Sequence, residues 1–233
     1  MSNHLSPPAL VTQMGGSYAA KLGINLDSLN THEVYKWFVA SLLYGAPISG
    51  SVATRTWHVF AKNDILTPKR MIERGWDKLV SLLDQGGYVR YDYKTATKLL
   101  DVNHALLKDY AGNLNELHAA ATDDRDLEQR IMDLGKGVGK VTVNIFLREL
   151  RGRWIKANPP LSPLALKAAQ ILGYFPDNWN GDPDDVLAYL QGLWKKCGMT
   201  AERFCDFEAA MIRKGLEIRR SEGRRRRLVG IGQ

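Results

Sequence analysis

The spacing of apolar residues predicts helices along nearly the whole chain. The segment 31–47, "THEVYKWFVASLLYGAP", repeats buried-type residues every three to four positions, at Val34, Trp37, Phe38, Ser41 and Leu42. This period is typical of a helix that turns one face toward a core. Thr31 precedes that face, and we expect its hydroxyl to cap the helix.

The same period, combined with start and stop signals, predicts further helices. They cover residues 49–62, 67–75, 76–84, 93–108, 114–120, 125–133, 141–150, 162–172, 184–196 and 200–220. The segments 150–163 and 173–185 contain prolines, glycines or polar residues and are predicted to be long connections. Strand-like alternation is nearly absent, so we expect an all-α fold.

Length and composition fit one domain or two small ones. The chain has 233 residues, of which 45% are hydrophobic. No uninterrupted apolar run is long enough to span a bilayer, and the N-terminus lacks a signal-peptide pattern. We therefore expect a cytoplasmic, nucleoid-associated protein. Cys197 and Cys205 are the only cysteines. They exclude a disulfide framework and a four-cysteine metal or iron–sulfur site within one chain, and we expect two buried thiols.

The positive charge is concentrated at the C-terminus. The net charge is +7, and residues 213–233 contain eight Lys/Arg and two Glu. The rest of the chain carries 24 basic and 23 acidic residues and is nearly neutral. A run such as 224–227, "RRRR", is typical of a solvated, disordered segment and equally of a segment that binds nucleic-acid phosphates.

A glycine-rich turn precedes one of the predicted helices. The segment 133–150 reads "DLGKGVGKVTVNIFLREL" and places three glycines within five residues. Such a turn at a helix N-terminus exposes backbone N–H groups at the positive end of the helix dipole, which suits a bound phosphate. The alternative is an ordinary tight turn between two helices.

The turn and its flanking helices resemble a known DNA-binding element. Helix 125–133, the hairpin "LGKGVGK" with its apolar anchors Leu134 and Val138, and helix 141–150 resemble the helix-hairpin-helix of the endonuclease III-like DNA glycosylase superfamily. Upstream, "FVASLLYGAPISGSVATRTWHVF" resembles that family's paired helices around a DNA-inserting loop. "LTPKRMIERGWDKLVSLLDQGGYVRYDYKTATKLL" resembles the segment that follows, and the order of elements agrees from residue 34 to residue 173.

The resemblance implies a helix-hairpin-helix DNA glycosylase fold with two helical subdomains and a cleft between them. Residues 1–30 would pack on the second subdomain. Residues 31–150 would form the first subdomain, with the helix-hairpin-helix at 125–150. Residues 151–218 would form the second subdomain, and residues 219–233 a basic tail.

The resemblance also implies which residues contact DNA. In the family the hairpin N–H groups hold a DNA phosphate beside the lesion, which assigns this role to Lys136, Gly137, Val138, Gly139 and Lys140. Fillers for the gap left by a flipped base would come from the loop 44–48, with Ala46 and Ile48, and from Tyr88. Tyr88 is large and flat enough to wedge between bases, or it packs on the protein surface. Outside the resemblance, the charge of the tail suggests that Arg224 and Arg225 contact further phosphates.

The chain departs from the family where the chemistry is expected. Val141 occupies the position of the catalytic lysine of bifunctional glycosylases, and Lys140 lies one residue earlier. One residue is about 100° around a helix, so Lys140 faces elsewhere and strand cleavage through a Schiff base is not expected. Ser162 corresponds to the catalytic aspartate. It could position a water, or Asp92 or Asp177 could supply the missing carboxylate, unless Asp92 is only a surface residue.

The expected function is that of a monofunctional DNA glycosylase that removes a damaged or modified base by hydrolysis. The expected partner is double-stranded DNA, with no cofactor, no metal, no membrane and a monomeric state. The alternative is a non-catalytic protein that binds distorted or abasic DNA. The sequence leaves the excised base open, because specificity depends on the shape of a pocket.

Overall fold

The regular structure of the chain is helical, which confirms the all-α prediction. The computed structural model describes residues 5–176, 179 and 182–230, in which one isolated β-bridge joins Arg151 and Trp154. Within these residues, no helix combines the length and apolar character needed to cross a membrane. The chain forms two compact units. Unit 1 consists of Met1–Lys21 and Pro159–Gln233, and unit 2 of Leu22–Asn158. The chain thus passes between units after Lys21 and after Asn158. The boundaries that the resemblance implies, at residues 30 and 150, differ from these by nine and eight residues, respectively.

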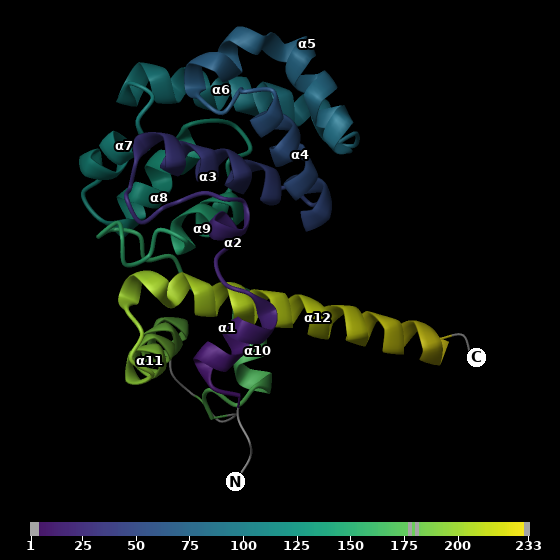
Figure 1. Ribbon diagram of the computed structural model, residues 1–233, viewed down its shortest axis with the longest axis vertical. Helices are drawn as coiled ribbons and strands as arrows, with labels where there is room; N and C mark the ends of the chain where they lie inside the picture. Colours follow the sequence, from purple (N-terminus) through teal and green to yellow (C-terminus); the bar gives the residue numbers. More distant parts are fainter. Residues whose placement is uncertain (1–4, 177–178, 180–181, 231–233) are drawn as a thin grey trace. The chain divides into compact units, whose positions relative to one another are not determined.

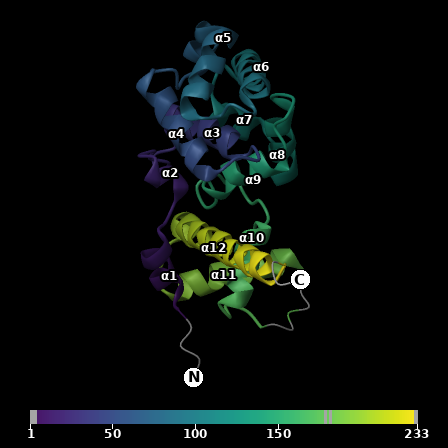
Figure 2. The same ribbon diagram turned by 90° about the vertical axis from the view of Figure 1, so that its right-hand side faces the viewer.

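Unit 2 contains the hairpin and the helices that support it (Figures 1 and 2). In chain order these helices are α3 (Thr31–Tyr44), α4 (Gly50–Lys62), α5 (Pro68–Gly86), α6 (Asp92–Tyr110), α7 (Leu114–Ala120), α8 (Asp124–Asp133) and α9 (Lys140–Arg148).

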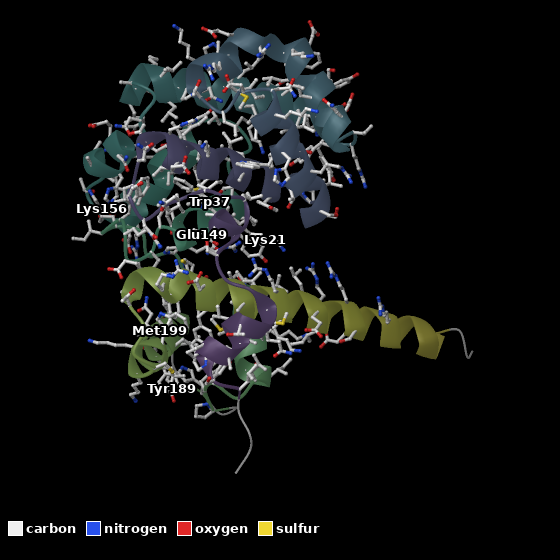
Figure 3. The ribbon with its side chains drawn as sticks, in the orientation of Figure 1. Lys21, Trp37, Glu149, Lys156, Tyr189 and Met199 are labelled. Atoms are coloured by element: carbon white, nitrogen blue, oxygen red, sulfur yellow. The ribbon has the colours of Figure 1, made fainter. Side chains whose placement is uncertain are left out.

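Helix α3 is the core of unit 2. It packs against α4, α7 and α9, and the predicted apolar face is fully buried. The Phe38 and Phe146 rings lie edge to face with centroids 5.0 Å apart. Trp37, labelled in Figure 3, donates from its indole Nε1 to the backbone oxygen of Phe146 at 3.0 Å. This contact therefore fixes α9 against α3 through both apolar burial and a buried hydrogen bond.

Two glycines shape the long α5–α6 arm of unit 2. Gly75 has φ +72° and interrupts α5, where the sequence predicted that one helix stops and another starts. Gly86 lies against Thr56 of α4, so closely that a Cβ at this position would stand 2.6 Å from the Thr56 Cα. The arm therefore meets α4 at a point that admits no side chain.

Unit 1 is built around the longest helix. It contains α1 (Pro7–Met14), α2 (Tyr18–Lys21), α10 (Pro163–Ile171), α11 (Pro183–Lys196), η1 (Ala201–Arg203) and α12 (Phe204–Gly230). Helices α1 and α10 pack on α12. The N-terminal segment is tied to α12 because Arg213 donates to Gly15 O at 2.6 Å and Asp206 accepts from Ser17 N at 2.8 Å.

Several local predictions need correction. Helix α3 is capped by Asn30, whose side chain accepts from His32 N, and Thr31 is the first helical residue. Periodicity did not predict the short helices α1 and α2, and α12 continues to Gly230, beyond the predicted end at residue 220. Cys205 is buried as expected, but Cys197 is exposed because it follows the last turn of α11.

The contact between Gly86 and Thr56 leads to a stability prediction. Gly86→Ala should destabilise the protein by about 1–3 kcal/mol, because the new methyl group must displace α4 from α5. The free energy of urea unfolding measures the effect. Gly192→Ala, in α11 with no heavy atom within 4 Å of the added Cβ, is the matched control and should be neutral or stabilising. Equal effects of both substitutions would contradict the prediction.

Candidate nucleic-acid interface

The predicted hairpin joins α8 to α9. Leu134 and Val138 are buried, with 3% and 5% of their surface exposed, which confirms their role as apolar anchors. Gly137 lies between them on the exposed side with φ +90°, a left-handed conformation that favours glycine. The buried side chains of Leu134 and Val138 therefore anchor the hairpin, and the backbone at Gly137 is exposed to solvent.

The backbone amides at the start of α9 have no acceptor. Gly139 is the N-cap residue and offers no side-chain oxygen to the first turn. Within the described residues, the N–H groups of Lys140, Val141 and Thr142 make no hydrogen bond, and the same holds for Gly137 and Gly139. First-turn amides point outward along the helix axis, with the positive end of the helix dipole behind them. An anion could accept hydrogen bonds from this group without displacing any protein contact.

Charged side chains surround these amides. Lys136 and Lys140 are both exposed. Glu128 of α8 lies within electrostatic reach of Lys140. Its pKa is raised by burial and by the Asp124 carboxylate, and the positive charge of Lys140 opposes this shift. Lys140 therefore faces a carboxylate of its own motif as well as solvent.

The loop that contains Ala46 and Ile48 lies against the first turn of α9. A Cβ at Gly45 would collide with the hydroxyl of Thr142, so the end of α3 and the start of α9 are in close contact. Ile48 N donates to Ala46 O at 2.8 Å, and both side chains are half-buried. The structure thus brings this predicted loop and the hairpin helix together in unit 2.

Tyr88 cannot act as a wedge in this structure. Only 1% of its surface is exposed, and its hydroxyl donates to Leu43 O at 2.7 Å. Burial raises its pKa far above the usual value, and a hydrogen bond with Thr95 only partly opposes the shift. The expected exposed position is wrong because the turn at Gly87, with φ +88°, leads the chain back into the core. Tyr88 instead supports the end of α3, directly before the Ala46–Ile48 loop.

Lys98 is a residue near the hairpin that the sequence did not single out. It belongs to α6 and is 9% exposed, although it is a lysine. The position that a Cβ would occupy at Gly137 lies 3.6 Å from Lys98 Cδ. The only sequence signal was its spacing of four residues from Lys94, which places both lysines on one face of α6.

The candidate catalytic residues are divided between the units. In unit 2, Asp92 is the first residue of α6 and accepts from Tyr93 N at 2.8 Å. Its carboxyl group also contacts that of Asp84 on α5. The pKa of Asp84 is raised by partial desolvation, by a hydrogen bond with the Asp92 carboxyl group and by repulsion between the two charges. In unit 1, Ser162 caps α10 by accepting from Ala165 N at 3.2 Å. Asp177 lies outside the described residues.

The remaining predicted residues are surface positions. Val141 is 64% exposed, so the position of the family's catalytic lysine opens to solvent here. Arg224 is exposed near the end of α12, and the side chain of Arg225 lies outside the described residues. Among the described side chains, no three from His, Cys, Asp and Glu lie close enough together to hold a metal ion.

The comparisons with protein families and with curated proteins found no relative. No family model matches the chain, and no significant match was found among the curated proteins. The resemblance to the endonuclease III-like glycosylases therefore rests on the motif and on the order of helices.

The buried hydroxyl of Tyr88 provides a test of its supporting role. Tyr88→Phe should lower the free energy of unfolding by about 1–3 kcal/mol, because Leu43 O loses its donor inside the core. Tyr93→Phe, at an exposed tyrosine in α6, is the control and should leave the stability unchanged. Thermal or urea unfolding measures both variants, and an unchanged stability of Tyr88→Phe would contradict the supporting role of the hydroxyl.

The carboxyl pair predicts a dependence of stability on pH. The pKa of Asp84 lies above its ordinary value of 3.8 in the folded protein, so folding is favoured while the group is protonated and loses that contribution as the pH rises. Asp84→Asn removes the repulsion between the two carboxylates. The variant should therefore melt at a higher temperature than the wild type at pH 7, and the difference should vanish at pH 3. A difference that persists at pH 3 would exclude the charge pair as its cause.

Proposed function

We propose that this protein is a monofunctional DNA glycosylase that binds duplex DNA containing a damaged or modified base. The observation that carries the proposal is the group of unpaired backbone amides at Gly137, Gly139 and the first turn of α9, beside two exposed lysines. A DNA phosphate matches this group in charge and in hydrogen-bond acceptors.

The bare backbone of the hairpin suits a duplex better than a small anion bound at a side-chain site. Gly137 and Gly139 carry no Cβ that would hold a sugar–phosphate strand away from the amides. Contacts of this kind fix the register of the protein on DNA and read no sequence. The arginines at the end of α12 would add long-range attraction, because the chain before residue 213 is nearly neutral.

The loop beside α9 is the remaining candidate for filling the gap left by a flipped base. Since Tyr88 is buried, Ile48 is the larger of the two remaining predicted filler side chains. Apolar side chains such as isoleucine insert between base steps in other proteins that distort DNA. Ala46, half-buried at the start of the loop, would then line the gap without filling it.

The chemistry would be hydrolysis without a covalent enzyme intermediate. Water adds to C1′ of the sugar, the N-glycosidic bond breaks, and the base leaves with a proton. Positive charge develops on the sugar, and a carboxylate lowers its energy. In unit 2 the candidate is Asp92, whose partner Asp84 holds a proton more readily than an isolated aspartate. Val141 offers no amine, so no Schiff base forms at that position.

A second function is favoured by a separate observation. The Oγ of Ser162 is used as a helix cap, so it supplies neither a charge nor a free oxygen for catalysis. A protein that keeps the hairpin and lacks the carboxylate would bind distorted or abasic DNA without cutting it. The two functions share the same DNA-binding surface and differ in whether free base is released.

The hairpin's part in DNA binding is tested by Gly139→Val. No heavy atom lies within 4 Å of the Cβ position at Gly139, and its φ of −106° is open to any residue, so the fold should be preserved. Affinity for duplexes of unrelated sequence should fall alike, because the side chain separates the amides from the phosphate. Fluorescence anisotropy measures the affinity, and Gly192→Ala is the control. Unchanged affinity in a folded variant would remove the hairpin from the interface.

Catalysis is tested with a panel of duplexes that carry uracil, mismatched thymine, oxidised or alkylated purines, or hypermodified cytosines. Free base should appear for at least one duplex, the strand should stay intact until alkali is added, and borohydride should trap no covalent complex. Release of base should be lost in Asp92→Asn. Tight binding of abasic DNA with no release from any substrate would instead support the non-catalytic function. Efficient trapping would identify a lysine nucleophile, with Lys140 the first to be replaced.

A further inference from the structure

Lys98 is an unusual lysine for the interior of a helical unit. It lies on α6 with 9% of its surface exposed. Within the described residues, no acceptor or carboxylate pairs with its ammonium group. Burial alone lowers its pKa below the ordinary value of 10.5. Lysines are rarely buried to this extent unless they are paired.

The ammonium group of Lys98 is nevertheless not completely enclosed. Lysine can bury its aliphatic stem and keep its charged end in water. Lys98 Nζ is not among the fully enclosed polar atoms of the described chain, although the residue as a whole is nine-tenths buried. The aliphatic stem is therefore buried in the protein, and the ammonium group keeps some contact with solvent.

The Lys98 side chain lies beside the exposed part of the hairpin. Lys98 Cδ lies 3.6 Å from the position of a Cβ on Gly137, and Gly137 is exposed with an unpaired amide. The hairpin also packs on α6 one turn later, where a Cβ at Gly135 would stand 2.8 Å from Val102 Cγ2. Two close approaches to α6 thus place the hairpin beside the Lys98 side chain.

We propose that the ammonium group of Lys98 and the free amides of the hairpin and α9 bind the same DNA phosphate. This inference rests on the proposed function. It adds a side chain from α6 to the hairpin amides that are proposed to bind a DNA phosphate. A Met at this position would fill the same volume without the cost of desolvating a charge. The charge is therefore expected to act in binding rather than in packing.

The surrounding charges are compatible with a single anion at this point. Lys94, four residues earlier on α6, and Lys136 and Lys140 of the hairpin motif are all exposed. Two acidic residues lie nearby: Asp101, with its Cβ 3.6 Å from the Cβ position at Gly135, and Glu128, within electrostatic reach of Lys140. No ion pair joins Asp101 to Lys98 among the described residues, so the lysine charge is not neutralised within the protein.

The experiment compares Lys98→Met with Lys108→Met in the full chain. Lys108 is exposed on the same helix, ten residues and about 15 Å further along, so both variants lose one charge from α6. Binding to a 20-base-pair duplex is measured between about 50 and 200 mM salt. In Lys98→Met the slope of log affinity against log salt should fall by about 0.9, the value of one phosphate contact. Affinity should fall about tenfold, while Lys108→Met should change both quantities much less.

A stability measurement separates loss of binding from loss of fold. Lys98→Met should melt at the same temperature as the wild type or higher, because the buried charge is removed. Lys98→Gln, which keeps a polar end without the charge, should show the same reduced slope. A full slope in both Lys98 variants, or an equal reduction in Lys108→Met, would overturn the proposal.

The result also distinguishes this inference from the proposed function. If Gly139→Val weakens binding and both Lys98 variants bind normally, the hairpin holds the phosphate without Lys98. If neither Gly139→Val nor the Lys98 variants change binding, the hairpin is not a DNA-binding surface and both proposals are wrong.

Discussion

The burial of α3 is the constraint on which the candidate interface depends. Phe38 and Trp37 hold α9 in place through Phe146, so the direction of the α9 N-terminus follows from the packing of the core. The last turn of α3 is fixed in turn by Tyr88, which donates to Leu43 O. Because the loop with Ala46 and Ile48 begins where α3 ends, core packing sets both the loop and the free amides beside it. If the hairpin binds DNA as proposed, a change in the core is expected to alter the affinity without any contact with DNA.

Close backbone approach explains why small residues occur at these junctions. A side chain at Gly45 would collide with Thr142, and one at Gly86 would collide with Thr56. The first contact joins α3 to α9 and the second joins α5 to α4, so the glycines bring helices together in addition to shaping turns. Gly137 and Gly139 instead leave backbone exposed: no heavy atom lies within 4 Å of the Cβ position at Gly139, and at Gly137 the neighbour is Lys98 Cδ at 3.6 Å. Glycine thus allows close helix packing at some positions and exposes the backbone at others. The surrounding residues distinguish the two roles.

Helices and hairpin could be predicted from the sequence because their signals are local. Apolar spacing, Thr-Pro and Ser-Pro starts and the glycine stop at Gly75 each act within a few residues, and α7 lies where periodicity placed it. The role of Tyr88 could not be predicted, because its burial depends on a turn that returns the chain to α3, 45 residues earlier. The burial of Lys98 likewise arises from a hairpin almost 40 residues later in the chain. Tertiary contacts of this kind leave no periodic signal.

The location of the candidate carboxylates bears on which of them could act with the hairpin. Asp92 and Lys98 belong to one helix, six residues and about 9 Å apart along its axis, and Lys98 lies beside Gly137. The spacing between the Asp92–Asp84 pair and a phosphate on the hairpin is thus set by a single rigid helix within unit 2. Ser162, by contrast, belongs to unit 1 and uses its hydroxyl to cap α10. Catalysis needs a carboxylate at a fixed distance from the DNA strand that the protein binds. If this protein cleaves the glycosidic bond, Asp92 meets that requirement through a helix that also carries a proposed phosphate ligand.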